Sequence, residues 1–202
     1  MARLRAAVLI SGRGSNMQAL HQATLAPDFP AEIALIISNQ GDAAGLDYAA
    51  EHKIPAVVMD DPAFKKRAAF DAKLDEILQK TGIEFICLAG FMRLLSHEFV
   101  EKWHDKIINI HPSLLPAFKG VEAPAQAFAA GVKIAGCTVH FVRSEMDAGP
   151  IIMQASCPVL PNDTVDTLAA RILKLEHEIY PKALAAIAAG KVKVIDNKTV
   201  IA

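Results

Sequence analysis

The feature that most constrains this 202-residue chain is the regular alternation of short apolar runs with segments of helical periodicity. The first five runs, read as strands, are residues 6–10, 32–37, 56–59, 85–88 and 107–111. Each is followed by a helix or a crossover, which is the rhythm of a parallel sheet. Two more strands are expected at residues 136–142 and 151–158. The sequence therefore predicts an α/β fold with a mostly parallel, twisted, Rossmann-like sheet of about seven strands and helices on both faces.

Composition indicates one compact domain over residues 1–202. The chain is 52% hydrophobic and 21% charged, and it contains no repeat or linker. Its 21 basic residues nearly balance 22 acidic ones, so it has no basic field for a polynucleotide. We expect no nucleic-acid partner, whereas a small phosphorylated ligand needs only a local group of donors.

The cysteines and the apolar segments indicate a cytoplasmic protein without a membrane segment. Cys87, Cys137 and Cys157 are odd in number and scattered in apolar stretches, which fits reduced thiols better than disulfides. None has a partner at metal-ligand spacing, so no structural metal is expected. The apolar run after Met1 is too short for a signal peptide, and no run approaches membrane-spanning length.

The strand at residues 107–111 carries a candidate catalytic pair. Side chains alternate across a strand, so Ile108 and Ile110 share one face while Asn109 and His111 share the other. Ligands of open α/β sheets bind at the carboxyl ends of the strands, where this pair lies. The alternative is that both polar groups are satisfied by hydrogen bonds in the core.

A glycine-rich turn follows the first strand and precedes a helix, a layout that presents backbone N–H groups to an anion. Its sequence is Ser-Gly-Arg-Gly-Ser-Asn, and Ser15 and Asn16 can add donors or cap the helix. A tight turn with a good cap is the alternative. A dinucleotide site is disfavoured, because the second strand ends in Ser38-Asn39-Gln40 without a carboxylate for a ribose.

Three charged residues elsewhere are candidates for the same site. Asp147, in the loop before Gly149-Pro150, can pair with an imidazole across the strand ends, or make an ordinary Asx-turn. Glu176 lies on the apolar face of the last helix, where a carboxylate is costly unless it is paired or bound to a ligand. Arg67 reads as a solvated arginine unless the fold brings it to the phosphate loop.

Local patterns also predict where the helices begin and end. The third helix is expected to begin at Asp61-Pro62 and to end at Thr81-Gly82. Thr164 is expected to begin the last helix, capped by Asp163 or Asn162 and bent at Pro181. The tail beyond Gly190 is expected to form a small hairpin around residues 196–198.

Five blocks of the chain, in order, resemble the phosphoribosylglycinamide formyltransferase family of folate-dependent enzymes. They are Leu-Ile-Ser-Gly-Arg-Gly-Ser-Asn, Leu-Ala-Gly-Phe-Met-Arg, Ile-Asn-Ile-His-Pro-Ser-Leu-Leu-Pro, Val-His-Phe-Val with Met-Asp-Ala-Gly-Pro, and Leu-Glu-His-Glu-Ile-Tyr-Pro. The resemblance implies transfer of a formyl group from the co-substrate 10-formyltetrahydrofolate to the amine of glycinamide ribonucleotide in purine synthesis. It also implies a monomer or weak homodimer, with a nucleotide-binding half at roughly residues 1–100 and a catalytic, folate-binding half at roughly 101–202.

The resemblance assigns roles to individual residues. The catalytic trio would be Asn109, His111 and Asp147. The residues implied to bind the ribonucleotide are Gly14, Ser15, Asn16 and Arg67 for the phosphate and Glu176 for the ribose hydroxyls. The residues implied to line the folate pocket are Met92, Arg93, Leu94, Leu95, Asn109, Arg143, Ser144, Glu145 and Asp147. Attack of an amine on a formyl carbon creates an oxyanion, which an amide N–H and a protonated imidazole beside a carboxylate can stabilise.

One segment departs from the family pattern. Residues 121–126, Val-Glu-Ala-Pro-Ala-Gln, stand where the family usually has a polar stretch containing histidine, and they are similar to methionyl-tRNA formyltransferase. That enzyme, however, has Gly rather than Pro after its central His and carries a further C-terminal domain. Formyltetrahydrofolate hydrolase, another relative, carries an N-terminal regulatory domain. A non-enzymatic nucleotide-binding protein is the alternative from another class, and the intact trio argues against it.

Overall fold

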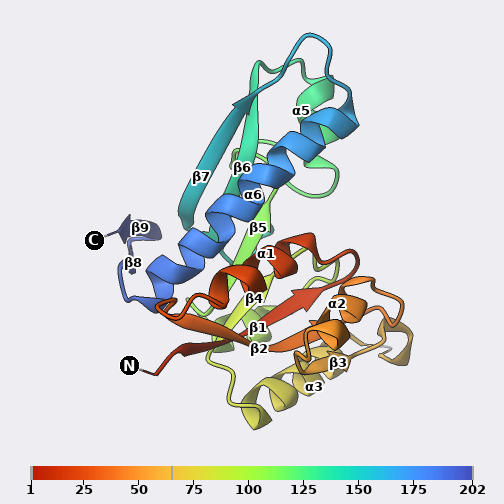
Figure 1. The fold of residues 1–202 in the computed structure, drawn as a ribbon, viewed down its shortest axis with the longest axis vertical. Helices are drawn as coiled ribbons and strands as arrows, with labels where there is room; N and C mark the ends of the chain where they lie inside the picture. Colours follow the sequence, from red (N-terminus) through yellow and green to blue (C-terminus); the bar gives the residue numbers. More distant parts are fainter. Residues whose placement is uncertain (1, 65, 202) are drawn as a thin grey trace.

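A computed structural model describes residues 2–64 and 66–201 of the chain (Figure 1). The strands are β1 Leu4–Ile10, β2 Ala31–Ser38, β3 Ala56–Val58, β4 Phe85–Leu88, β5 Ile107–His111, β6 Ile134–Phe141, β7 Ile151–Pro158, β8 Val192–Ile195 and β9 Lys198–Ile201. The α-helices are α1 Ser15–Thr24, α2 Gly45–Glu51, α3 Arg67–Lys80, α4 His97–Lys102, α5 Ala123–Ala129 and α6 Val165–Ala188, with a short 3-10 helix at Asp61–Ala63.

The main sheet has seven strands in the order β3-β2-β1-β4-β5-β6-β7. The strands β1 to β5 are parallel, while β6 runs antiparallel to both β5 and β7. The predicted α/β fold with a mostly parallel sheet of about seven strands is therefore confirmed. Consecutive β1 residues belong to different cores, Ala6 and Val8 to one and Ala7 and Leu9 to the other, which explains why this strand is apolar throughout.

Helices cover both faces of the sheet, as predicted. On one face, α1 and α6 lie side by side in the view of Figure 1 and bury Leu20 and Ile172 against the strands. On the other face, α3 and α4 bury Phe70, Leu74 and Trp103. The two faces thus have separate hydrophobic cores with the strands between them.

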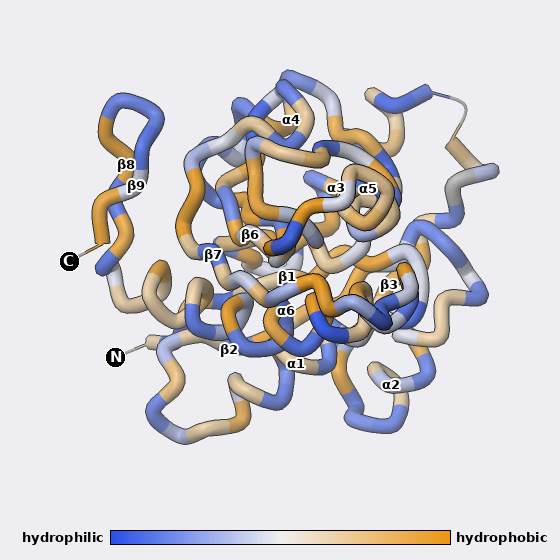
Figure 2. The backbone as a smooth tube through the Cα atoms, turned by 90° about the horizontal axis from the view of Figure 1, so that it is seen from above, coloured by the Kyte–Doolittle hydropathy of each residue, from blue (hydrophilic) through white to orange (hydrophobic). Residues whose placement is uncertain are grey.

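Two hairpins extend from the parallel part of the molecule. The long strands β6 and β7, with α5 beside them, project at the top of Figure 1. The strands β8 and β9 form a separate two-stranded sheet at the left of Figure 2, which packs Val192 and Val194 against the core and has turn residues Asp196 and Asn197 at φ 48° and 57°. Two successive left-handed residues make the tight turn favoured by hairpins, so the predicted tail hairpin is confirmed.

The predicted cap of the last helix is wrong, and Arg171 is the reason. Thr164 is itself the cap: its hydroxyl accepts the Thr167 backbone N–H, and the Thr167 hydroxyl accepts that of Thr164. Asp163 is instead held by two hydrogen bonds of 2.7 Å from Arg171. The helix α6 continues through Pro181 to Ala188.

The predicted start of the third helix is wrong. Asp61 and Pro62 belong to the short 3-10 helix, and α3 begins only at Arg67. The cap of α1 is Gly14 at φ 72°, with no side-chain hydrogen bond from Ser15 or Asn16. The turn before α1 therefore depends on glycine rather than on a capping side chain.

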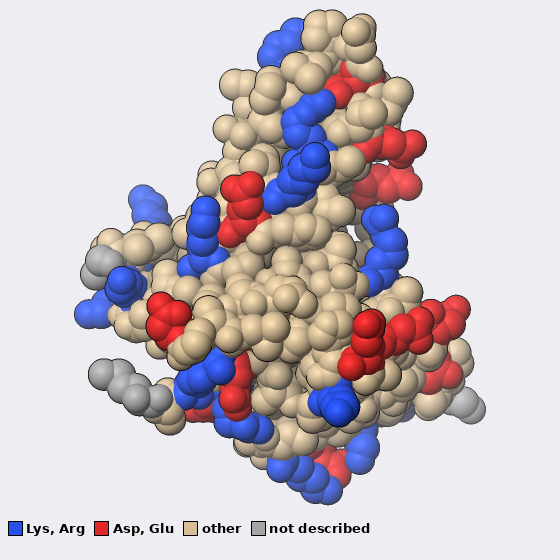
Figure 3. Space-filling model, viewed as in Figure 1, with Lys and Arg blue, Asp and Glu red and all other residues tan. Residues whose placement is uncertain are grey.

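On the face shown in Figure 3, groups of Lys and Arg lie among groups of Asp and Glu, in keeping with 21 basic and 22 acidic residues. Among the helices in the described ranges, none combines the length and the apolar character that crossing a membrane requires.

Tyr180 links α6 to the strands β4 and β5 by hydrogen bonds, and removing its hydroxyl tests how much these bonds stabilise the fold. The side chain is fully buried, and its hydroxyl donates to the Leu88 carbonyl at 2.8 Å, with the Ile108 carbonyl at 3.3 Å. Tyr180→Phe should lower the free energy of unfolding by about 1–3 kcal/mol, because it leaves buried carbonyls without their donor. Chemical denaturation measures this change. Tyr48→Phe, at a half-buried tyrosine of α2, is the control, and equal losses in both variants would contradict this stabilisation.

Candidate active site

The polar pair Asn109 and His111 lies at the end of β5, as the sequence predicted. Ile108 and Ile110 pack into the core beneath α6, whereas Asn109 and His111 project from the other face of the strand. His111 is 5% exposed, and its Nε2 lies 2.9 Å from the carbonyl oxygen of Phe118. A carbonyl only accepts, so this nitrogen carries a proton and donates. The other ring nitrogen, Nδ1, is thereby turned toward the loop that carries Asp147.

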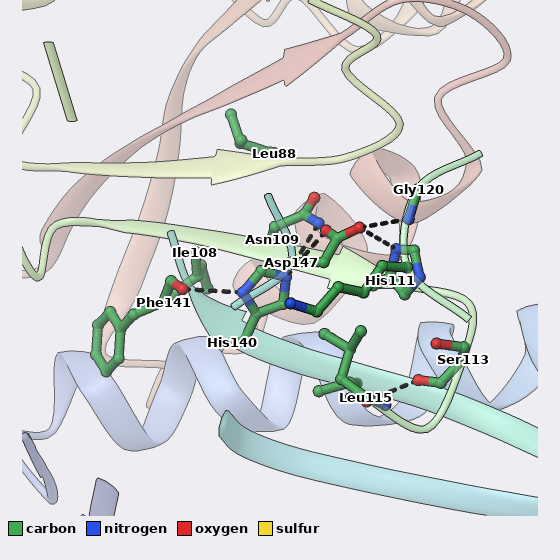
Figure 4. A network of polar contacts seen from close by, with 12 residues as sticks. Leu88, Ile108, Asn109, His111, Ser113, Leu115, Gly120, His140, Phe141 and Asp147 are labelled. Atoms are coloured by element: carbon green, nitrogen blue, oxygen red, sulfur yellow. Dashed lines mark hydrogen bonds and ion pairs between the residues drawn. The ribbon is translucent and has the colours of Figure 1, made fainter. Parts of the chain in front are cut away.

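Asp147 lies directly beside His111 (Figure 4). Its Oδ2 is 3.5 Å from His111 Nδ1 and accepts the Gly120 backbone N–H at 2.8 Å. The two side chains are only 6% and 9% exposed, so the contact is shielded from water. A protonated His111 can donate at both ring nitrogens, to Phe118 and toward Asp147. Of the two alternatives for Asp147, the structure therefore shows the pairing with an imidazole, that of His111.

Asp147 was expected to reach the imidazole directly across the strand ends, but its loop takes a different path. Because β6 is antiparallel to β5, its last residue Phe141 pairs with Ile108, before the end of β5. The loop must then fold back over β5 to bring Asp147 to His111. Two contacts hold this return path, Arg143 to Asp105 at 2.5 Å and the Ser144 hydroxyl to His97 Nδ1 at 2.6 Å.

His140 completes the cluster, and the sequence analysis assigned it no role. Its Nδ1 donates to the Phe141 carbonyl at 2.9 Å, and burial lowers the pKa of this imidazole, which favours the neutral ring. The neutral ring then offers a lone pair at Nε2, which lies 3.3 Å from Nδ2 of Asn109. The Asn109 amide nitrogen therefore points toward His140. The signal in the sequence was a histidine inside an apolar strand, but its opposition to Asn109 depends on the β5–β6 register.

A cavity of about 660 Å³ opens beside this cluster. Of the residues predicted to line the folate pocket, its wall contains Met92, Arg93, Leu94, Leu95, Asn109, Arg143, Ser144 and Asp147. Glu145 is not in the wall and pairs with Lys119 at 3.0 Å on the surface. Met146, from the same predicted loop, lies in the wall. The guanidinium of Arg93 lies 4.2 Å above the ring of Phe70, which fixes its direction along the cavity.

A second cavity of about 560 Å³ surrounds the glycine-rich turn. It is lined by Gly12, Arg13, Gly14, Ser15 and Asn16, by Ala89 and Gly90, and by α6 residues Asp166, Ala169, Ala170, Leu173 and Glu176. Because no side chain caps α1, the backbone N–H groups of its first turn face this space, and they suit a phosphate. A Cβ on Gly14 would lie 3.0 Å from the Gly45 Cα, and Gly14 has a left-handed φ of 72°. Glycine at this position is therefore required by both packing and conformation.

Glu176 lies where the two cavities meet. It is 6% exposed and accepts a 2.6 Å hydrogen bond from Asn16 Nδ2. Burial raises the pKa of its carboxyl group, and the bond from Asn16 opposes that shift. Asn16, Gly90 and Glu176 line both cavities. The buried Oδ1 of Asn16 has no protein partner, so a polar ligand at this junction would find an acceptor there.

Arg67 begins α3, is exposed and lines neither cavity. The helix α3 packs on one face of the sheet, whereas α1 and α6 pack on the other. The cation that lines the second cavity is Arg13, which the sequence analysis did not single out. Within residues 2–64 and 66–201, no group of three or more His, Cys, Asp or Glu side chains could hold a metal ion.

Comparison with known proteins gives the site its family context. The formyl transferase family model matches residues 4–184. The chain is 50% identical over 195 residues to the trifunctional purine biosynthetic protein adenosine-3 of Bos taurus, covering 96% of this chain but only 19% of that protein. It is 39% identical to the phosphoribosylglycinamide formyltransferase of Haemophilus influenzae, covering 95% of this chain and 90% of that enzyme.

A solved structure agrees with these sequence matches. The crystal structure of glycinamide ribonucleotide transformylase 1 from Symbiobacterium toebii superimposes with a TM-score of 0.96 at 47% identity, over 98% of this chain and 94% of that one. The fold and the sequence point to the same family. The chain belongs to the formyl transferase family, among the folate-dependent phosphoribosylglycinamide formyltransferases.

Proposed function

We propose that this protein transfers the formyl group of 10-formyltetrahydrofolate to the amine of glycinamide ribonucleotide, a step of purine synthesis. One observation carries the proposal: two cavities of different character meet at Asn16, Gly90 and Glu176, with Asn109, His111 and Asp147 in the wall of the larger. A formyl donor in the larger cavity and a phosphorylated acceptor in the smaller would thus bring their reacting groups together.

The larger cavity suits the folate. Exposed Met92 and Leu94 and the half-buried ring of Phe91 line it with apolar surface, while Arg93 and Arg143 add cations. The polar side chains of Arg143 and Ser144 already bind Asp105 and His97. Contacts from this loop to the folate would therefore come mainly from its backbone.

The smaller cavity suits the ribonucleotide. The turn from Gly12 to Asn16 would hold the phosphate through backbone N–H groups, with the Gly14, Ser15 and Asn16 contacts implied by the family and Arg13 as a nearby cation. Glu176 would accept hydrogen bonds from the ribose hydroxyls. Arg67, which the family resemblance implies as a further phosphate contact, begins α3 and is exposed.

The chemistry follows from the positions of the trio. The amine lone pair attacks the formyl carbon, and the carbonyl π electrons move to oxygen. The resulting oxyanion would be stabilised by an N–H of the Asn109 amide and by the positive charge of His111 when it is protonated. The new ammonium gives up a proton with the help of the His111–Asp147 pair. The bond from carbon to N10 then breaks, and N10 takes a proton as it leaves.

Several broader expectations remain parts of this proposal. We infer a cytoplasmic enzyme that acts without a metal or a nucleic-acid partner, as a monomer or weak homodimer. The three unpaired, buried cysteines support a reducing compartment. Both cavities draw residues from before and after residue 100, so a division into nucleotide-binding and catalytic halves stays a prediction.

The substrate assignment can be tested directly with competing acceptors. Glycinamide ribonucleotide should be formylated in the presence of 10-formyltetrahydrofolate, because the second cavity matches a small phosphorylated ligand. Initiator methionyl-tRNA should not be formylated. Product analysis by mass spectrometry decides between them, with an acceptor-free reaction as the control for folate hydrolysis. Efficient formylation of the tRNA, or steady hydrolysis without acceptor, would overturn the assignment.

A double-mutant cycle tests whether His111 and Asp147 act as one unit. His111→Ala and Asp147→Asn should each lower kcat by about 10²–10⁴, the range for positioned acid–base groups. The double variant should be little slower than the slower single one, because groups that work together give strongly non-additive losses. Single-turnover formyl transfer provides the measurement. Multiplicative losses would mean that the residues act separately.

Glu176→Gln tests the carboxylate at the junction. Binding of the ribonucleotide should weaken by about 1.5–3 kcal/mol, the range for hydrogen bonds to a charged group, while folate binding changes little. Titration calorimetry with each ligand distinguishes these effects. If ribonucleotide affinity is unchanged, Glu176 does not bind the ribose.

The same variant has a pH-dependent stability signature. The folded-state pKa of Glu176 is raised, so the folded protein holds this proton more tightly than the unfolded chain does. This contribution to stability is present below the unfolded pKa and is lost as pH rises through the folded one. Glu176→Gln should therefore gain stability over the wild type as pH increases from about 4.5, the ordinary value. Thermal melting of both proteins at several pH values measures this difference. An equal difference in Tm at every pH would contradict the prediction.

A further inference from the structure

Gln126 bridges the loop next to the catalytic trio. It is the fourth residue of α5, in the segment where the sequence departs from the family pattern. Its Nε2 donates to two backbone carbonyls, that of Lys119 at 3.1 Å and that of Val121 at 2.8 Å. These carbonyls flank Gly120, so one carboxamide holds the backbone on both sides of this glycine.

The contact to Lys119 reaches Asp147 through a single rigid unit. The carbonyl of Lys119 and the N–H of Gly120 belong to the same planar peptide group, and in a trans peptide they point in opposite directions. Gln126 holds the carbonyl end, while Asp147 Oδ2 accepts from the N–H end at 2.8 Å. Fixing one end therefore aims the other. Hydrogen bonds arranged in such a chain also polarise one another.

The loop needs an external restraint to keep this shape. Phe118, Gly120 and Glu122 all have left-handed backbones, at φ 55°, 80° and 55°. Two of the three are not glycine, and such conformations persist only where the surroundings enforce them. The Phe118 carbonyl also receives the His111 hydrogen bond. A relaxed loop would thus disturb the contacts of both His111 and Asp147.

The helix α5 is a firm base for the carboxamide. Ala123 and Ala127 are 0% and 2% exposed, and α5 packs against α6. Pro124 lies in its first turn, where the ring pre-sets the helical backbone. The Gln126 backbone N–H bonds to the Glu122 carbonyl at 3.0 Å, so the base of the side chain is fixed as well.

We propose that Gln126 is a positioning residue for formyl transfer, acting on Asp147 through the Lys119–Gly120 peptide. The inference rests on the proposed function for its effect on rate. The hydrogen-bond chain itself can be tested without either substrate. Gln126 touches neither cavity wall, so a change in chemistry on its substitution would have to pass through the loop.

Three substitutions separate hydrogen-bond donation from side-chain shape. Gln126→Met keeps length without donors, Gln126→Glu keeps shape without donors, and Gln126→Arg keeps donors with another shape. Met and Glu should each slow single-turnover transfer about tenfold, less than the about 10²-fold that a 1 Å misplacement costs. Arg should stay within about threefold of wild type, since its N–H groups can reach the same carbonyls. The KM values for both substrates should change by less than about threefold, since uniform binding is not affected.

Hydrogen exchange at the Gly120 amide provides the readout without substrates. Protection of this amide should fall about tenfold in the Met and Glu variants, because its acceptor geometry is lost, and should be kept in the Arg variant. Gln22→Met is the matched control, since Gln22 donates to the Tyr48 hydroxyl at the exposed surface of α1. It should leave both rate and Gly120 protection unchanged.

Each contrary result identifies a different error. Full rate in Gln126→Met would show that the positioning has no effect, even if protection fell. Unchanged Gly120 protection in that variant would show that the hydrogen-bond chain does not restrain the loop. A Gln126→Arg variant as slow as the Met variant would make side-chain shape the cause. If wild type transferred no formyl group at all while protection behaved as expected, the proposed function would fail and the structural restraint would stand.

Discussion

The shielded contact between His111 and Asp147 is the interaction on which the rest of the site depends. A carboxylate that is 9% exposed is costly unless hydrogen bonds and an opposite charge compensate for the loss of water. Asp147 obtains both, from the Gly120 N–H and from His111 when it is protonated. Bringing these groups together requires the loop after β6 to fold back over β5. The reversal of direction at β6, in an otherwise parallel sheet, is what supplies that loop.

The strand carrying the catalytic pair could be predicted because its information is local. The alternation of side chains predicted that Asn109 and His111 share one face. Pro112 predicted that the strand ends at His111, and β5 ends there in the structure. The order of the strands in the sheet, in contrast, depends on contacts between segments that are far apart in the sequence. Successive right-handed crossovers from β1 to β3 put α1 and α2 on one face, and the return to β4 on the far side of β1 puts α3 on the other. The resemblance implies a phosphate role for Arg67, whereas the local interpretation of a solvated arginine agrees with its exposure.

The same distinction explains the residues that the sequence did not reveal. His140 has its place only through the register that sets it opposite Asn109. The helices α4 and α5 span six and seven residues, too few to show a clear helical period. Asp163 looked like a helix cap, but a nearby Arg171 took its carboxylate, and Thr164 capped instead. In each case a contact between distant or competing groups decided what the local pattern left open.

Strained backbone conformations occur in the two loops beside the trio, and they determine how these loops can serve a ligand. Phe118, Glu122 and Asp147 all have left-handed backbones without being glycine. Such loops hold their shape only when they are tied to rigid elements, and here the ties use up side chains: Arg143 binds Asp105 and Ser144 binds His97. The side chains of Arg143 and Ser144 therefore maintain the shape of the loop, and the backbone at these two residues is presented to the larger cavity. A backbone surface tolerates changes in side chains that keep the ties, whereas a substitution at Asp105 or His97, outside the cavity wall, would alter the site from a distance.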